Sequence, residues 1–214
     1  MSAGSHRRAY FESGLKRGFD VVMAGSALLV LSPLLAAIAI AIASLMGRPV
    51  LYVQERIGRS GRPFRLLKFR TMRPDDGRGP CVTASGDPRV TPLGRLLRRS
   101  KLDELPQLVN VLRGEMSVVG PRPELRRYVD GYDDWQRGVL RARPGLTDPA
   151  SIAYRDEESR LASVEPGRRE AAYVSEIVPE KLRLNLAYLD HASFWSDLAV
   201  IASTVRALFG TAFR

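Results

Sequence analysis

The sequence predicts an α+β protein that is mainly helical, with an N-terminal membrane helix ahead of one mixed domain. Three observations support this prediction. Residues 21–46 contain no Asp, Glu, Lys or Arg. Two short apolar stretches then flank a glycine-containing turn, which is typical of a β-hairpin. Apolar residues recur at helical spacing in the C-terminal third. We therefore divide the chain into residues 1–48 and residues 49–214.

The composition excludes several classes of protein. The chain has 214 residues, with 33 Lys and Arg against 23 Asp and Glu, so its formal charge is +10. A content of 45% apolar residues excludes a disordered tail. The single cysteine, Cys81, excludes an intramolecular disulfide framework and fits a reducing compartment. The mean hydropathy of -0.13 excludes a polytopic membrane protein, but this average hides an uneven distribution.

The uncharged segment spans 26 residues and is rich in Ala, Leu, Ile and Val. As a helix it would reach about 39 Å, enough to cross a hydrocarbon core of about 30 Å. A buried helix of a soluble protein rarely needs so long a run without charge, so we expect insertion into a membrane. A signal peptide is a weaker alternative, because its apolar core is usually shorter, at about 7–15 residues.

Ser32 and Pro33 interrupt this segment near its middle. Proline lacks the backbone N–H and clashes with the preceding turn, so we expect a kink, with the Ser32 hydroxyl satisfying a carbonyl that Pro33 leaves free. The positive-inside rule places basic flanks in the cytoplasm. Such residues lie at both ends: Lys16 and Arg17 before the segment, and Arg48, Arg56, Arg59, Arg62 and Arg65 after it. We therefore expect a re-entrant helix that enters and leaves through one membrane face, with a kinked spanning helix as the alternative.

A small hairpin and a short helix are expected next. Residues 50–54 and 64–69 are predicted strands, and residues 58–61 (GRSG) supply a turn between them. Residues 73–87 contain several glycines and prolines and are predicted to form a loop. Residues 92–99 are predicted to form a basic helix that begins at Pro92.

Asp103 and Glu104 form an adjacent acidic pair just before another predicted helix. A buried stripe on that helix is predicted from the spacing of Leu105, Leu108, Val109 and Leu112. Pro106 is tolerated only in a first turn, so the acidic pair lies at or just before the helix N-terminus. The helix dipole favours acidic residues there, which makes helix capping one interpretation. Two adjacent carboxylates can also serve one metal ion, and both interpretations stay open at this point.

Arg122 lies between Pro121 and Pro123. The two prolines fix its backbone in an extended form. A guanidinium on a stiff backbone suits bidentate recognition of phosphate, and a loop with a surface arginine is the alternative. Residues 143–147 (RPGLT), which begin with Arg143, form a second and weaker turn of this kind.

The C-terminal third is predicted to be helical. Residues 170–178 and 181–189 are expected to form two helices divided by Pro179. A last helix is expected to carry an apolar stripe of Phe194, Trp195, Leu198, Ile201, Val205, Leu208 and Phe209. Such a stripe packs into a core or lies in the membrane interface, and both alternatives stay open. His6 and His191 are the only histidines, so the sequence has no Cys/His cluster for zinc, and it has no P-loop.

Taken in order, these motifs resemble those of the bacterial sugar transferases, the monotopic phosphoglycosyl transferases. The resemblance covers about residues 16–208. It rests on Lys16-Arg17 with Asp20, the Ser32-Pro33 break, QERIG at 54–58, KFRTM at 68–72, DPRVT at 87–91, LDELPQL at 102–108, GPRP at 120–123 and RPGLT at 143–147. The chain departs from the commoner pattern at Asp148-Pro149. Residues 150–158 resemble one subgroup and are expected to shape the sugar pocket. Larger members carry extra N-terminal spanning helices, and this chain resembles the minimal catalytic unit.

The resemblance implies a reaction and a cofactor. Members of this family move a phospho-sugar from a UDP-sugar to undecaprenyl phosphate, and they release UMP. They use an Asp-Glu dyad, a divalent metal (usually Mg²⁺) and a covalent intermediate. Carried onto this chain, Asp103 is the nucleophile, and Glu104 together with Asp103 holds Mg²⁺. The re-entrant helix of the family agrees with the charge argument above. It implies a cytoplasmic catalytic domain, with interfacial amphipathic helices, on the bacterial inner membrane.

Basic residues near these motifs are candidate contacts for the diphosphate or the uridine. The first candidates are Lys68, Arg98 and Arg122, with Pro121 and Pro123 positioning Arg122. The weaker candidates are Arg56, Arg70 and Arg143. The expected partners are a UDP-sugar, undecaprenyl phosphate and the bacterial inner membrane, in the first membrane step of a glycoconjugate pathway (exopolysaccharide, O-antigen or glycoprotein). The identity of the sugar and the oligomeric state stay open.

Two rival functions compete with this interpretation. A charge of +10 also fits a membrane-tethered nucleic-acid binder, but no recognised nucleic-acid motif occurs, so we expect no nucleic-acid partner. A catalytically inactive membrane scaffold would keep the fold, and the intact Asp103–Glu104 dyad argues against it. We therefore assign the positive charge to anionic lipid headgroups and to a diphosphate substrate.

Overall fold

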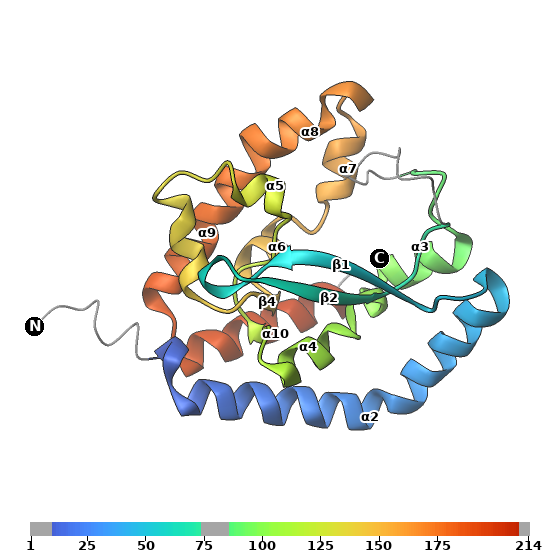
Figure 1. Cartoon of the computed structure of the whole chain (residues 1–214), viewed down its shortest axis with the longest axis horizontal. Coiled ribbons are helices and arrows are strands. Elements are labelled where there is room, and N and C mark those ends of the chain that lie inside the picture. The colour runs from blue at the N-terminus through green and yellow to red at the C-terminus, as the bar shows by residue number, and fades with distance from the viewer. Residues whose placement is uncertain (1–9, 74–85, 210–214) are drawn as a thin grey trace, which may run out of the picture.

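The structure, a computed structural model, describes residues 10–73 and 86–209. Most of these residues are helical, and the strands form one antiparallel hairpin and one short parallel pair. A long helix, α2 (Gly14–Met46), lies along one side of the molecule, and the hairpin of β1 (Leu51–Ile57) and β2 (Pro63–Phe69) crosses the domain beside it (Figure 1). The predicted class, mainly helical with a small hairpin, is confirmed.

Helix α2 has the length and the apolar composition of a membrane helix. It begins after Ser13, whose side chain accepts a hydrogen bond from the Lys16 N–H, and it ends before Gly47, which has a φ of 75°. Only 11% of its most apolar window is buried, whereas a core helix of a soluble protein would bury most of that surface. The exposed side chains include Leu29 and Ile40. These features support contact with a membrane.

The helix is continuous through Pro33, and its C-terminal part is bent (Figure 1). Pro33 has no N–H to donate to the carbonyl of Leu29, four residues earlier. The Ser32 hydroxyl donates to that carbonyl instead, at 2.8 Å, as predicted. Because this bond replaces the missing one, the structure has one bent helix where a break between two helices was expected. Re-entry through one membrane face stays a prediction.

A buried side chain closes the outer edge of the hairpin. Asn110 Oδ1 accepts from the Leu67 N–H at 3.1 Å, and Asn110 Nδ2 donates to the Arg65 carbonyl at 2.7 Å. Asn110 thus takes the place of a third strand and fixes β2 against its own helix, α4 (Gln107–Arg113). β1 is longer than predicted, because its pairing with β2 continues as far as the 3₁₀ turn η1 (Arg59–Gly61).

Helix α3 (Pro92–Arg99) has the predicted bounds and is capped by the Thr91 side chain. A 3₁₀ turn, η2 (Leu102–Glu104), separates α3 from α4. The predicted stripe is wrong at its end, because Leu112 is 38% exposed and Val111 is buried instead. A 3₁₀ turn has about three residues per turn, and this shifts the buried face relative to a continuous α-helix.

Short elements connect α4 to the C-terminal helices. They are β3 (Ser117–Val119), α5 (Arg126–Val129), η3 (Gln136–Arg141), β4 (Gly145–Thr147), α6 (Pro149–Ala153), α7 (Glu157–Ala162) and η4 (Pro166–Arg168). β3 and β4 pair in parallel, which brings residues 120–123 beside residues 143–147. A Cβ on Gly145 would lie 2.2 Å from the Gly120 backbone, so the close approach of these two turns requires glycine.

Residues 169–191 form one helical run rather than the two helices predicted. α8 (Arg169–Ala172) leads into a π-helical turn, η5 (Tyr173–Ile177), and then into α9 (Val178–His191). Pro179 is an early residue of α9, and the wider π turn comes directly before it. The missing N–H is tolerated there, so proline changes the helical register without ending the helix.

The last helix, α10 (Phe194–Phe209), has the predicted bounds. Part of its apolar stripe is uncovered by protein, since Trp195, Val205 and Leu208 are 76%, 48% and 40% exposed, whereas Ile201 packs against the core. Phe194 packs edge-to-face on Phe19 of α2, with 5.3 Å between the ring centroids. This geometry favours the interfacial alternative for the helix, which stays a prediction.

A buried ionic network joins α2 to the rest of the domain. Lys16 Nζ lies 3.1 Å from Asp20 Oδ1 and 2.7 Å from Asp197 Oδ2 of α10. Asp20 Oδ1 also accepts from the Ser117 hydroxyl and from the Val118 N–H, both at 3.0 Å. The Lys16 ammonium is therefore inside the protein, and it does not face lipid headgroups as the argument from flanking charges assumed.

Candidate active site

The Asp103–Glu104 pair lies on η2, in a position where three distant parts of the chain converge. Both side chains are buried, at 7% and 8% exposed. Lys101 adopts a left-handed backbone conformation, with a φ of 56°, and so turns the chain from α3 into η2. Lys68 reaches the pair from β2, and Arg122 reaches it from the turn that follows β3.

Glu104 is held by two cations. Arg122 donates to both carboxylate oxygens, at 2.6 Å to Oε1 and 3.3 Å to Oε2. Lys68 Nζ lies 2.9 Å from Oε1. Burial by itself would raise the pKa of Glu104, but Arg122 and Lys68 overcome this effect and hold that pKa well below its ordinary value. Glu104 is therefore an anion in the free protein.

Asp103 is the opposite case. Its Oδ1 is buried and has no hydrogen-bond partner among the described residues. Burial, and then the neighbouring Glu104 charge, raise the pKa of Asp103 to about 6, against the opposing effect of Lys68, Lys101 and Arg98. Glu104 is thus paired with two protein cations, and Asp103 has an oxygen without a hydrogen-bond partner that is nucleophilic once it is deprotonated.

Arg98 lies at the edge of this site. Its guanidinium forms an ion pair with Glu158 of α7. The neighbouring Glu157 is paired with Lys181 of α9, at 2.8 Å. These two contacts fasten α7 over the side of the site that α3 borders. The Arg98 guanidinium, which the sequence predicts to bind a phosphate, is therefore paired with Glu158 in this structure.

Arg56 contacts the two residues that follow Arg122. Its guanidinium donates to the Pro123 carbonyl at 3.2 Å and lies 3.6 Å from Glu124 Oε2. Pro121 and Pro123 flank Arg122 in the sequence. The backbone of this turn is bonded to β1 through the contact between Arg56 and the Pro123 carbonyl. Arg56 therefore holds the turn that carries Arg122.

Arg70 and Arg143 have other partners. Arg70 donates to the carbonyls of Met46 and Gly47, at 2.6 Å and 2.5 Å, at the C-terminal end of α2. Cations are favoured there by the helix dipole. Arg143 donates to the Gly114 carbonyl at 3.0 Å. Neither residue forms a hydrogen bond or ion pair with Asp103 or Glu104, so both side chains have structural explanations.

The donor set around Asp103 is compatible with Mg²⁺. Across residues 10–73 and 86–209, no group of three or more His, Cys, Asp or Glu side chains forms a protein-only metal site. Mg²⁺ does not require one, because it usually takes one or two carboxylates together with substrate phosphates and water. The buried Asp103 Oδ1, which has no protein partner, fits this mode of binding.

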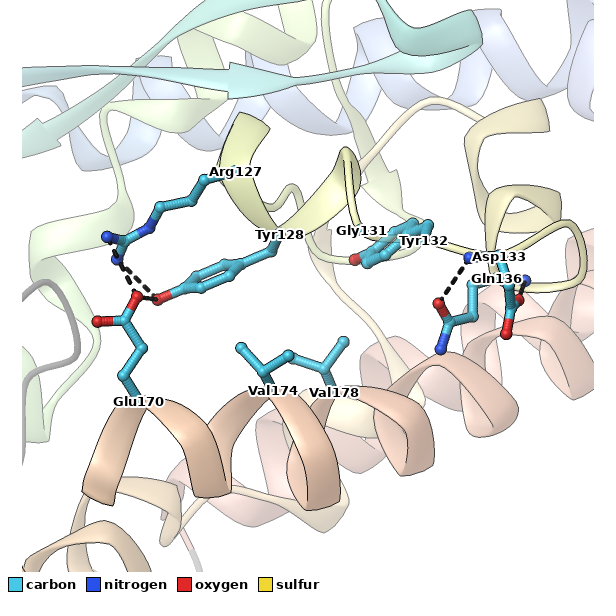
Figure 2. A pocket seen from close by; sticks show the side chains of 9 residues that line it. All are labelled: Arg127, Tyr128, Gly131, Tyr132, Asp133, Gln136, Glu170, Val174 and Val178. Atoms are coloured by element: carbon cyan, nitrogen blue, oxygen red, sulfur yellow. Dashed lines mark hydrogen bonds and ion pairs between the residues drawn. The ribbon is translucent and has the colours of Figure 1, made fainter.

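A cavity of about 440 Å³ lies between α5 and the η5–α9 helix. Figure 2 shows Arg127, Tyr128 and Glu170 on one side of it, with Asp133 and Gln136 on the other. The Arg127 guanidinium bonds the Tyr128 hydroxyl at 2.7 Å and lies 3.2 Å from Glu170. On the other side, the Asp133 and Gln136 side chains each accept a hydrogen bond from the other's backbone N–H, at 3.0 Å. None of the residues that line the cavity belongs to the predicted site.

Sequence reasoning missed three residues near the site. Glu124, Glu158 and Tyr173 are acidic or phenolic side chains on surrounding elements, and none has a distinctive spacing. The position of Glu124 directly after Pro123 is the one sequence feature that could have pointed to it. Its side chain accepts a hydrogen bond from the Tyr173 hydroxyl, at 2.7 Å.

Comparison with known proteins identifies the family. Residues 11–211 match the family described as bacterial sugar transferase. The chain is 38% identical to a UDP-glucose:undecaprenyl-phosphate glucose-1-phosphate transferase of Caulobacter vibrioides, over 92% of this chain and 70% of that protein. It is 36% identical to the exopolysaccharide production protein ExoY of Rhizobium meliloti, over 90% of this chain and 84% of that protein.

Some relatives are much longer. A UDP-glucose:undecaprenyl-phosphate glucose-1-phosphate transferase of Escherichia coli is 36% identical over 89% of this chain, but the match covers 39% of that protein. The match with the family nevertheless includes the apolar helix α2, the hairpin, the Asp103–Glu104 turn and the C-terminal helices. The chain therefore belongs to the bacterial sugar transferase family.

Proposed function

We propose that this protein transfers a phospho-sugar from a UDP-sugar to undecaprenyl phosphate at the cytoplasmic face of the bacterial inner membrane. UMP is released, and the product is a polyprenyl diphosphate-sugar. The observation that supports this most directly is the unequal pair of buried carboxylates. Glu104 is bound by Arg122 and Lys68, whereas Asp103 keeps an oxygen without a protein partner. Two relatives are named as UDP-glucose:undecaprenyl-phosphate glucose-1-phosphate transferases.

Asp103 is the nucleophile in this proposal. Its free carboxylate oxygen attacks the phosphorus that carries the sugar, and an oxygen–phosphorus bond forms as the bond to UMP breaks. The result is an acyl phosphate on Asp103. A phosphate oxygen of undecaprenyl phosphate then attacks the same phosphorus and releases Asp103. Two displacements replace one difficult displacement between two anions.

Positive charge makes the approach of two anions feasible. Lys68 and Arg122 neutralise Glu104, the residue next to Asp103, and in this proposal they contact diphosphate oxygens. Mg²⁺, held by Asp103 and Glu104 with the diphosphate, would supply further charge stabilisation. Arg98 joins these residues when it exchanges Glu158 for a phosphate, because a guanidinium binds either anion through the same donors.

The membrane helix is packed next to this site. Ile38 and Ile42 of α2 are buried with Phe69 and Leu97 in one apolar cluster. Phe69 follows Lys68 on β2, and Leu97 precedes Arg98 on α3. The part of the domain that carries the reacting groups is therefore attached to the membrane segment, which suits a lipid phosphate at the membrane surface.

The first test is an assay of UMP release with undecaprenyl phosphate, Mg²⁺ and a panel of UDP-sugars that begins with UDP-glucose. UDP-N-acetylgalactosamine belongs in the panel, because a relative of Aeromonas hydrophila is named for that sugar. Incubation without the lipid is expected to leave a phospho-sugar adduct on Asp103, detectable by mass spectrometry, and Asp103→Asn is expected to form none. If no UDP-sugar gives UMP release, the inactive scaffold is favoured. An adduct on another residue would contradict the role of Asp103.

A further inference from the structure

Glu124 lies at the end of the turn that carries Arg122 and is held by groups from other elements. It is 9% exposed. The Tyr173 hydroxyl donates to its Oε1 at 2.7 Å, and Arg56 lies 3.6 Å from its Oε2. The Ile57 N–H of β1 donates to its backbone carbonyl at 3.0 Å. Both ends of this residue, the carboxylate and the peptide, are therefore fixed by groups from the hairpin and from η5.

Tyr173 is itself fixed in place by its backbone and by its ring. It is the first residue of the π-helical turn η5, and π turns inside helices are frequent at functional sites. Its ring packs on the ring of Tyr128, with 5.3 Å between centroids, and Lys181 Nζ lies 5.5 Å from its centroid. Burial and the nearby Glu124 charge raise the pKa of Tyr173 well above its ordinary value, so its hydroxyl keeps its proton and remains a donor.

The position of Glu124 determines the position of Arg122. Only Pro123 separates the two residues, and proline restricts the backbone on both sides of Arg122. The space beneath the turn is packed, since the cavity lined by Pro121, Arg122 and Pro123 measures about 20 Å³, close to the size of one water molecule. A tilt of Glu124 is therefore transmitted to the guanidinium that contacts Glu104.

We infer that Tyr173 and Glu124 are positioning residues that align Arg122 with the diphosphate of the UDP-sugar. This inference rests on the proposed function. Tyr173 does not touch the reacting atoms, and it acts through the Glu124 carboxylate. Neutral hydrogen-bond donation by Tyr173 suits this role, because it fixes the carboxylate without cancelling the charge that Arg56 binds.

A double-mutant cycle separates positioning from a general effect on the fold. Tyr173→Phe keeps the buried ring and removes the hydroxyl that binds Glu124. Tyr128→Phe is the matched control, because it removes a neighbouring hydroxyl that bonds Arg127 and Glu170 at the rim of the large cavity. Each change is made in the wild type and in Arg122→Ala, and kcat/KM for the UDP-sugar is measured by UMP release.

In the wild-type background, Tyr173→Phe is expected to lower kcat/KM about tenfold, and Tyr128→Phe less than about twofold. In the Arg122→Ala background, Tyr173→Phe is expected to have no further effect, because the residue through which it acts is gone. Equal losses in both backgrounds, or equal losses for the two Phe variants, would overturn the inference while the proposed function stands. No UMP release by the wild type with any UDP-sugar would overturn both.

Discussion

Arg122 donates to both carboxylate oxygens of Glu104, which links the proline-flanked turn after β3 to the 3₁₀ turn before α4. These residues are separated by 18 positions in the chain. Glu104 lies on η2, and Arg122 lies in the segment between β3 and α5. Arg122 and Lys68 together hold Glu104 as an anion, whereas Asp103 Oδ1 has no hydrogen-bond partner among the described residues. The two carboxylates of the pair therefore differ in their surroundings before any substrate binds.

Glu104→Gln is expected to destabilise the protein by about 2 kcal/mol, because Arg122 and Lys68 would lose a charged hydrogen-bond acceptor in a buried position. The measurement is urea unfolding in detergent, and the control is Glu158→Gln. Glu158 is about half exposed, so its loss is expected to change stability by less than about 0.5 kcal/mol. Equal changes for the two variants would show that the contact with Arg122 adds no stability.

Asp103→Asn is expected to keep the fold and to remove a pH dependence of stability. Burial, and then Glu104, raise the pKa of Asp103 from 3.8 to about 6. A carboxyl with a raised pKa stabilises the folded state while it is protonated. Its contribution is therefore complete below pH 3.8 and is lost as the pH rises through about 6.

Metal-free wild-type protein should accordingly lose on the order of 1–3 kcal/mol across this window relative to Asp103→Asn. Urea unfolding of both proteins at about pH 4 and about pH 7 gives the difference. The comparison between the wild type and Asp103→Asn cancels the titration of carboxylates remote from Asp103. A difference that does not change with pH would mean that Asp103 titrates normally.

Both flanks of α2 are expected to lie on the cytoplasmic side of the membrane. After Cys81 is replaced by Ser, single cysteines at Ser5 and Arg62 are tested with a reagent that does not cross the membrane. Labelling of both sites from the same side supports re-entry, and labelling from opposite sides refutes it. Pro33→Leu restores an N–H for the Leu29 carbonyl, so this variant is expected to favour a straight spanning helix and labelling from opposite sides.

Lys16→Met is expected to destabilise the junction between α2 and α10 by about 3–5 kcal/mol, because Asp20 and Asp197 would be left as buried charges without a cation. Arg183→Met is the control, since Arg183 pairs with Glu180 on an exposed helix surface and its removal should cost less than about 1 kcal/mol. Thermal unfolding in detergent gives both values. A small effect of Lys16→Met would mean that the network carries little of the stability of the junction.

Local patterns predicted the elements that depend on neighbouring residues. The apolar run predicted α2, Pro92 and Phe194 marked the starts of α3 and α10, and the turn at residues 58–61 predicted the hairpin. The Ser32 hydrogen bond followed from the chemistry of proline alone. In each case the deciding interaction lies within a few residues along the chain, so the sequence contains the information directly.

The stripe on α4 and the division at Pro179 were predicted incorrectly for a common reason. A 3₁₀ turn at η2 and a π turn at η5 change the number of residues per turn, and a fixed helical period does not anticipate either. Both irregular turns carry residues of the proposed site or its proposed support: Asp103 and Glu104 lie on η2, and Tyr173 lies on η5. Departures from regular patterns are expected at functional sites.

The motifs name Asp103, Glu104, Lys68, Arg98 and Arg122 as candidates for the chemistry, and their roles stay a prediction. The partners of these side chains follow only from the three-dimensional arrangement. Arg122 and Lys68 bind Glu104 rather than Asp103, Arg56 supports the turn, and Arg70 and Arg143 bond backbone carbonyls elsewhere. Charge and hydrogen-bonding capacity belong to each side chain, but the partner that uses them is set by distances between segments remote in the chain.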